Sequence, residues 1–364
     1  MNQISPSQLS IMIANFILAG SLITLAQVMT QVSHQYTWLV PILVYMIVMG
    51  LILIVFRKSN NQSKNNNLQA RSFTSRILNI CIGLLLVGIY IRDLRAFIDY
   101  LRSYILPETP IEILSILVTL ALIYVAASGL QAIARITVIQ FITLTAMILS
   151  LPILLLNEIE LPNLVPILTI GTFSNLSKST FLMFPWIGEI VIFFLVVENI
   201  TYKKHIKKAF IKGISHGILL LFILISLNIS VLGAGIVENV TYPNILTIQQ
   251  INVTDFLDRL DLAIVIVWMP CLLSKMALSL YCIQRITNNL KLFQTNLHLT
   301  PVSLLLGILV VVLFENNIAH LRYAFLSWTT IGFALEMMIF SLFFLHQINK
   351  KREKKATEGG ASYT

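Results

Sequence analysis

Long apolar stretches follow one another along almost the whole chain, and they limit its possible folds more than any other feature. Of the 364 residues, 57% are hydrophobic and only 11% are charged, against about 25% charged residues in a soluble domain. Only helices and closed barrels satisfy their backbone in lipid, and a spanning helix needs about 20 apolar residues. We therefore predict an all-α integral membrane protein, one polytopic transmembrane domain over residues 1–364. The predicted ten transmembrane helices are roughly 9–31, 36–56, 76–99, 111–130, 133–156, 180–199, 209–234, 258–284, 301–319 and 324–347.

Basic residues gather in every second loop between these spans. Most of the 25 lysine and arginine residues lie in 57–76, 200–212, 285–299 and the tail 348–364. Such loops face the cytoplasm, so both termini are predicted to be cytoplasmic and 348–364 to be a basic cytoplasmic tail. Anchoring in a lipid bilayer explains the net charge of +9, and no nucleic-acid partner is expected.

The sixth predicted span is interrupted at its centre. Its middle residues are Phe184, Pro185, Trp186, Ile187, Gly188 and Glu189. The proline removes a backbone donor and clashes with the preceding turn, and the glycine adds a flexible point. The glutamate places an ionisable carboxyl near mid-membrane, where such groups are costly and usually functional. This combination predicts a ligand site rather than a plain membrane anchor.

The first predicted span contains a second, weaker interruption. Its residues Ala19, Gly20, Ser21 and Thr24 are small or carry hydroxyl groups within an otherwise apolar helix. Ten spans divide into halves of five, about 9–156 and 180–347, which have opposite orientations because five is odd. The interrupted spans are then the first of each half, which is the best sequence indication of a midplane binding site. The half-helix N-termini at such breaks suit a carboxylate ligand.

Several stretches in order along the chain carry a family resemblance. They are Ile4-Ser5 with Gln8, Ala14-Asn15, Ala19-Gly20 and Leu25, then Tyr36-Thr37-Trp38, Leu106-Pro107-Glu108-Thr109-Pro110, Phe184 with Gly188-Glu189, and Arg259 with Val267-Trp268. In these the chain resembles the permease-like B subunit of GerA-type bacterial spore germinant receptors. That family is similar to the amino acid–polyamine–organocation transporters.

The resemblance implies a LeuT-like fold, a five-plus-five inverted repeat with helices 1 and 6 broken. It further implies a multi-pass subunit of the spore inner membrane that binds a small germinant, often an amino acid. An A-type membrane subunit and a C-type lipoprotein subunit would be its partners. The family's pocket region corresponds by position to Leu85, Ile89, Ser274 and Leu278, for each of which core packing is an equal alternative.

Charged residues inside the predicted spans leave several interpretations open. Lys275 lies deep in the eighth span, where an ammonium group is costly unless it is paired. It would pair with Glu189, stand where related transporters hold a sodium ion, or extend into a polar cavity. Glu189 is either a ligand-responsive carboxyl or a structural partner of Lys275 or of freed N–H groups. Arg92, Asp93 and Arg95 are read as a solvated helix end or a vestibule lining, and Glu336 as having an unidentified polar partner.

The sequence contains no nucleophile–base arrangement, phosphate loop or metal-ligand spacing, so neither an enzyme nor a cofactor is expected. The three cysteines lie in apolar segments without paired spacing. Gly213 and Gly217 match the small-xxx-small pattern of helix contacts. Three functions remain: a germinant-binding receptor subunit, a secondary amino-acid transporter coupled to protons or sodium, or an ion or water channel within a larger germination assembly.

Overall fold

The computed structural model describes residues 3–22, 24–59, 73–165, 171–251, 260–292 and 299–360. Arg259 and the last four residues of the predicted tail lie outside these ranges. Within them the chain folds almost entirely into helices. The main helices are α1 (Pro6–Ser21), α2 (Leu25–Ser33), α3 (Val40–Ser59), α4 (Phe73–Tyr104), α5 (Ile111–Ala127), α6 (Leu130–Leu154), α7 (Thr172–Gly188), α8 (Phe193–Val196), α9 (Ile206–Leu232), α10 (Ala234–Val237), α11 (Pro243–Gln249), α12 (Leu260–Asn289), α13 (Leu299–Leu313), α14 (Asn317–Arg322) and α15 (Trp328–Gly360).

Seven helices of the described chain are long and apolar enough to cross a membrane, and α5 and α13 are shorter apolar helices. With α1, they account for the ten predicted spans. Several boundaries were predicted wrongly; α4, for example, extends to Tyr104 rather than ending near residue 99. The ninth span ends at Leu313 and residues 317–319 already belong to α14, while α7 begins at Thr172 rather than near residue 180. Hydropathy alone detects neither shift, because the polar first turn of α7 is still helical, whereas residues 314–316 between α13 and α14 are not helical.

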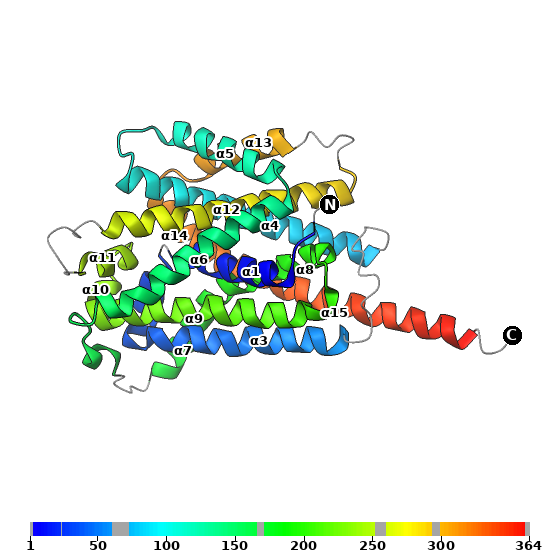
Figure 1. The fold of residues 1–364 in the computed structure, drawn as a ribbon, viewed down its shortest axis with the longest axis horizontal. Coiled ribbons are helices and arrows are strands. Elements are labelled where there is room, and N and C mark those ends of the chain that lie inside the picture. The colour runs from blue at the N-terminus through cyan, green and yellow to red at the C-terminus, as the bar shows by residue number, and fades with distance from the viewer. Residues whose placement is uncertain are drawn as a thin grey trace.

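The helices run along one axis, with α1 inside the bundle (Figure 1). Helix α1 packs on α9, α6 and α12, and residues 12–21 of α1 are all buried. Helices α5 and α13 lie along one edge of the bundle and α3 along the opposite edge. Helices α10 and α11 cover one end, and α1 begins at the other end. The interrupted first span therefore lies at the centre, surrounded by spans from both halves of the chain.

The first span breaks as predicted, between Ser21 and Leu25. The break frees backbone carbonyls at the end of α1, and other elements satisfy two of them. Trp268 Nε1 of α12 donates to the Ala19 carbonyl at 3.0 Å, and Asn244 Nδ2 of α11 donates to the Leu22 carbonyl at 2.5 Å. Buried carbonyls need such partners, so the capping helix α11 and the break stabilise each other.

The interruption of the sixth span is a change of helix type. Helix α7 contains Pro185 and ends at Gly188, and a 3₁₀ turn, η3 (Glu189–Ile192), follows before α8. A 3₁₀ segment within a long helix often marks strain or a hinge. Glu189 is the first residue of this turn and is fully buried.

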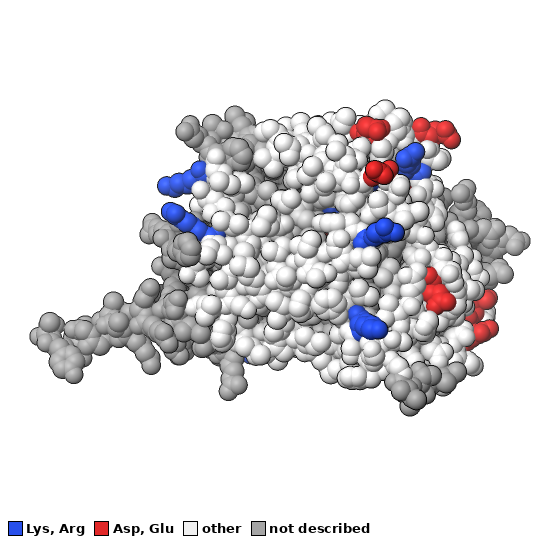
Figure 2. Space-filling view, turned by 180° about the vertical axis from the view of Figure 1, so that it is seen from behind, with Lys and Arg blue, Asp and Glu red and all other residues white. Residues whose placement is uncertain are grey.

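Charged side chains on the surface leave a band between the two ends of the bundle. Figure 2 shows the acidic side chains of that face toward one end, together with some basic ones, and further basic side chains at the other end, with a nearly uncharged band between the two ends. Large apolar side chains such as Ile139, Ile153 and Val312 are exposed. An uncharged apolar belt around a helical bundle is the surface that faces lipid. The protein is thus a multi-pass integral membrane protein.

The two glycines of the small-xxx-small motif lie against α1. A Cβ at Gly213 would meet the Ser10 carbonyl, and one at Gly217 would lie 3.0 Å from the Ala14 carbonyl. We expect Gly213→Leu to separate α1 from α9 and to lower the free energy of unfolding by about 3 kcal/mol, at the upper end of overpacking costs. Thermal unfolding of the purified chain in lipid nanodiscs measures this. Gly50→Leu is the control, since nothing lies within 4 Å of a Cβ there, and equal melting of the two variants would contradict the prediction.

Candidate functional site

Four charged side chains form a closed ring in the middle of the bundle. Arg92 and Asp93 come from α4, Glu189 from η3 and Lys275 from α12, and each is at most 2% exposed. Arg92 Nη2 lies 2.5 Å from Asp93 Oδ1, and its Nη1 lies 2.6 Å from Glu189 Oε1. Lys275 Nζ closes the ring, at 2.9 Å from Asp93 Oδ2 and 2.8 Å from Glu189 Oε2. We call this set the charge ring.

The charge ring is electrically neutral, because it holds two cations and two anions in alternation. Each cation contacts both anions and each anion contacts both cations. Buried ions are tolerated only with such close pairing, since removing one partner leaves an uncompensated charge in a low-dielectric interior. The ring joins three helical elements that lie far apart in the sequence, so its geometry depends on how those elements pack.

Aromatic rings and a glycine enclose the charge ring. The Arg92 guanidinium carbon lies 3.9 Å from the centre of the Trp186 ring, and Lys275 Nζ lies 4.6 Å from that of Phe16. Cations are attracted to aromatic faces, more strongly where water is excluded. At the end of α1, a Cβ on Gly20 would overlap the Lys275 ammonium group. The bare Cα of Gly20 therefore lets the break of α1 approach the ring.

A second buried polar group continues from the ring toward the end covered by α11. Arg95 Nε lies 3.0 Å from Asp99 Oδ1, and Arg95 Nη1 donates to the Phe314 carbonyl at 2.7 Å. His320 of α14 lies between Asp99 Oδ2, at 3.4 Å, and the Arg92 carbonyl, at 3.1 Å. His320 thus connects the backbone at the ring to this second group.

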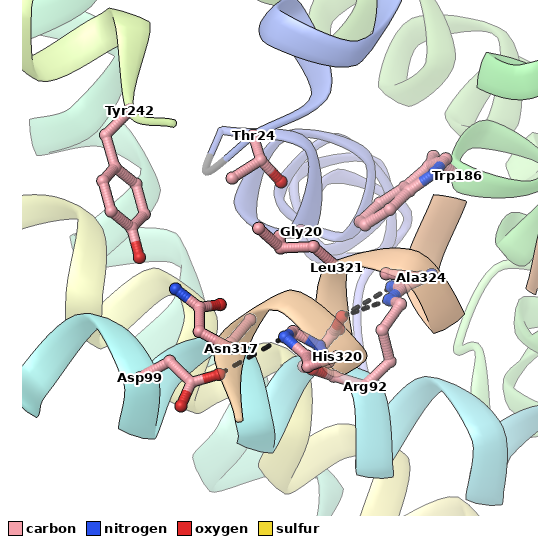
Figure 3. Close-up of a pocket in the computed structure, with 12 residues that line it drawn as sticks. Gly20, Thr24, Arg92, Asp99, Trp186, Tyr242, Asn317, His320, Leu321 and Ala324 are labelled. Atoms are coloured by element: carbon pink, nitrogen blue, oxygen red, sulfur yellow. Dashed lines mark hydrogen bonds and ion pairs between the residues drawn. The ribbon is translucent and has the colours of Figure 1, made fainter. Parts of the chain in front are cut away.

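A small cavity touches the charge ring at Arg92 and Asp93, and its volume is about 20 Å³. Figure 3 shows Thr24, Trp186, Tyr242, Asn317 and His320 around it. A water molecule needs roughly 10–15 Å³ by this measure, so the cavity holds about one. An amino acid would therefore require the bundle to open.

A wider vestibule of about 460 Å³ lies next to this cavity, and the two share Asp99 and Asn317 as lining residues. Arg95, Arg102, Glu112 and Glu315 also line the vestibule, so it is charged with both signs. Asp99, which lies 3.4 Å from His320, therefore borders both the vestibule and the small cavity.

Tyr242, just before α11, covers the cavity from the capped end. It packs edge-on against Tyr100 and Tyr104, with ring centres 5.6 Å and 5.3 Å apart. Burial raises the pKa of Tyr242 to about 12, so its hydroxyl keeps its proton at neutral pH and remains a hydrogen-bond donor.

The predicted site residues fall into three groups. Gly20, Thr24 and Trp186 line the cavity. Lys275 and Glu189 pair as one interpretation predicted, at 2.8 Å, in the charge ring. The remaining predicted residues are buried in packing or local hydrogen bonds around it; these are Ala19, Ser21, Leu85, Ile89, Phe184, Pro185, Ile187, Gly188, Ser274 and Leu278. Ser274 Oγ, for example, donates to the Cys271 carbonyl at 2.9 Å.

The reading of Arg92, Asp93 and Arg95 as a solvated helix end is wrong. All three are at most 2% exposed, because α4 extends to Tyr104 and places them inside the bundle. The unidentified polar partner expected for Glu336 is also not found, since neither carboxyl oxygen has a hydrogen-bond partner among the described residues. The sequence analysis missed four residues that line the small cavity: Asp99, Asn317, His320 and Tyr242. The sequence signal that could have indicated this side of the site is the presence of four charged residues within eight positions of α4, from Arg92 to Asp99.

Sequence comparisons agree on one family. The family model described as "Spore germination protein" matches residues 3–320. Three relatives come from Bacillus subtilis (strain 168). The spore germination protein YfkT is 30% identical over 72% of this chain and 75% of its own length. Spore germination protein KB is 27% identical over 98% of each chain, and spore germination protein B2 is 25% identical over 72% of each.

Solved transporter structures share the fold. Mhp1, a nucleobase-cation-symport-1 family transporter in a closed conformation, matches with a TM-score of 0.68 and 13% identity, over 94% of this chain and 78% of Mhp1. A Na⁺-coupled sialic acid symporter in an outward-open state matches with a TM-score of 0.60 and 13% identity, over 94% and 79%. At this identity the likeness concerns the fold alone, and it confirms the predicted LeuT-like architecture.

Proposed function

The chain belongs to the spore germination protein family, and on that premise we propose that it is the B subunit of a germinant receptor. It binds a small germinant, an amino acid, at the charge ring, and passes the signal to partner subunits. The observation that carries this proposal is the neutral ring of alternating charges beside the break of α1.

An amino acid matches the charge ring because it is a zwitterion. Its ammonium group can take the place of a cation beside Glu189 or Asp93, and its carboxylate can take the place of an anion beside Arg92 or Lys275. The site then stays neutral and every buried charge keeps a partner, which is the condition for burying ions at low cost. A ligand with a single net charge would leave one ring member unpaired.

The closed state of the cavity supports a signalling role. With room for about one water molecule, ligand entry requires α1, η3 and α12 to move apart. Such a movement changes the surface that neighbouring subunits contact, and a ligand can shift it only through tighter binding to the open form. We propose an A-type membrane subunit and a C-type lipoprotein subunit as those neighbours. The chain would lie in the inner membrane of the spore, with both termini on the core side.

Glu189→Gln is expected to raise the amino-acid concentration needed for half-maximal germination about 100-fold. This change corresponds to about 3 kcal/mol, the lower end of the cost of breaking a buried ion pair. Spores lacking the chain are complemented with wild type or variant and tested against an amino-acid panel. Glu158→Gln, at an exposed position, is the matched control. A full response from Glu189→Gln spores at normal protein level would remove this carboxylate from the site.

A secondary transporter is the second candidate, favoured by the shared fold with two symporters. Purified chain in liposomes should then give saturable amino-acid uptake driven by a proton or sodium gradient, without partner subunits. The receptor proposal expects none, and also expects no germination when the partner subunits are deleted and this chain is present.

A further inference from the structure

One buried acid has no place in the charge ring. Glu336 of α15 is 0% exposed, and neither of its oxygens has a hydrogen-bond partner among the described residues. Its carboxyl packs directly on Gly188, where a Cβ would overlap it. Gly188 is the last residue of α7 before the 3₁₀ turn that carries Glu189.

The surroundings of Glu336 do not compensate a negative charge. From η3, Glu189 faces it with a like charge. From α4, Arg92 is the cation whose field reaches it, yet that guanidinium already contacts Asp93 and Glu189. Beside these charges, α15 packs on α7 through apolar side chains, and its Trp328 ring lies 5.3 Å from the Arg92 guanidinium carbon.

Those apolar contacts surround the same helix face. From α7, Phe181 and Phe184 pack on Phe333, with ring centres 5.0 and 5.2 Å apart, and Pro185 packs on Gly332. An isolated carboxylate in such an interior costs many kcal/mol, and such a group becomes neutral instead. A neutral carboxyl group can pack against the Cα of Gly188 without a hydrogen-bond partner at a far lower free-energy cost.

We propose that Glu336 is a proton-binding site, protonated in the closed bundle and deprotonated when the bundle opens. On opening, the proton leaves the carboxyl oxygen for water, and the resulting carboxylate attracts Arg92 away from the charge ring. Protonation of Glu336 thus stabilises the closed bundle where α15 packs on Gly188. This inference goes beyond the proposed function, because it needs no amino acid and holds for receptor and transporter alike.

Infrared spectroscopy of the purified full chain in nanodiscs at neutral pH tests the proton directly. The carbonyl-stretch band of a protonated carboxylic acid, shifted in heavy water, should be present in wild type and in Glu158→Gln. It should lose intensity in Glu336→Gln and in Glu336→Met. An unchanged band in both Glu336 variants overturns the proposal. Failure of both neutral variants to fold also overturns it, because the closed state would then need the carboxylate.

Thermal unfolding against pH gives an independent readout. If the folded chain holds one proton more than the unfolded chain, its stability falls as pH rises. This loss begins above about pH 4.3, where a glutamate in water ionises. The melting temperature of wild type should therefore fall relative to that of Glu336→Gln as the pH increases. A constant difference between the two proteins across the pH range overturns the proposal.

Discussion

Lys275→Met is expected to lower the free energy of unfolding by about 3–5 kcal/mol, the cost of removing one partner from a buried ion pair. Lys275 is 1% exposed and contacts both anions of the charge ring. Without it, Asp93 and Glu189 share one cation, Arg92, and the interior carries a net negative charge. Unfolding of the purified chain in nanodiscs measures the loss, and Lys178→Met, at an exposed position, should leave stability within about 0.5 kcal/mol of wild type.

A second substitution separates charge balance from packing. In Lys275→Met/Glu189→Gln the interior is neutral again, with Arg92 and Asp93 as one ion pair 2.5 Å apart. The double variant should therefore be more stable than Lys275→Met alone, with a coupling energy of about 1–3 kcal/mol. Additive losses would mean that the two side chains act independently, and the charge ring would not be an energetic unit.

The parts of the fold that follow from local chemistry were predictable. Pro185 with Gly188 predicted an interruption of the sixth span, which the structure shows as a change of helix type, and Gly20 with Ser21 predicted the break of the first span. Both predictions depend on residues whose backbone effects act on their own helix. The pairing of Lys275 with Glu189 was one of the three interpretations open from the sequence, because a buried ammonium group is costly unless it is paired.

The rest of the site depends on packing between helices that are distant in the sequence. Arg92 and Asp93 looked like a helix end, since a hydropathy pattern places charges at the nearest membrane surface. Both residues are buried because α4 continues to Tyr104 and because α12 and η3 pack beside α4. His320 and Tyr242 carry no local signal at all, because their roles depend on where α14 and the segment before α11 cover the cavity.

Gly20→Val is expected to abolish the germinant response and to lower the free energy of unfolding by about 3 kcal/mol, at the upper end of overpacking costs. The reason is space, not backbone freedom, because Gly20 lies within α1. A side chain there meets the Lys275 ammonium group and forces it out of the charge ring. Gly50→Val in α3 is the control, since a Cβ at Gly50 has nothing within 4 Å.

The smaller change Gly20→Ala allows a sharper test of the same contact. In an ordinary helix this substitution stabilises by about 0.5–1 kcal/mol, as expected for Gly50→Ala, whereas at position 20 it should destabilise. A Cβ at position 20 overlaps Lys275 Nζ but lies an ordinary 3.6 Å from Lys275 Cε. Methionine lacks the terminal nitrogen, so Gly20→Ala should cost nothing further in a Lys275→Met background. If it costs as much there as in wild type, the close approach of α1 to the charge ring is not the cause.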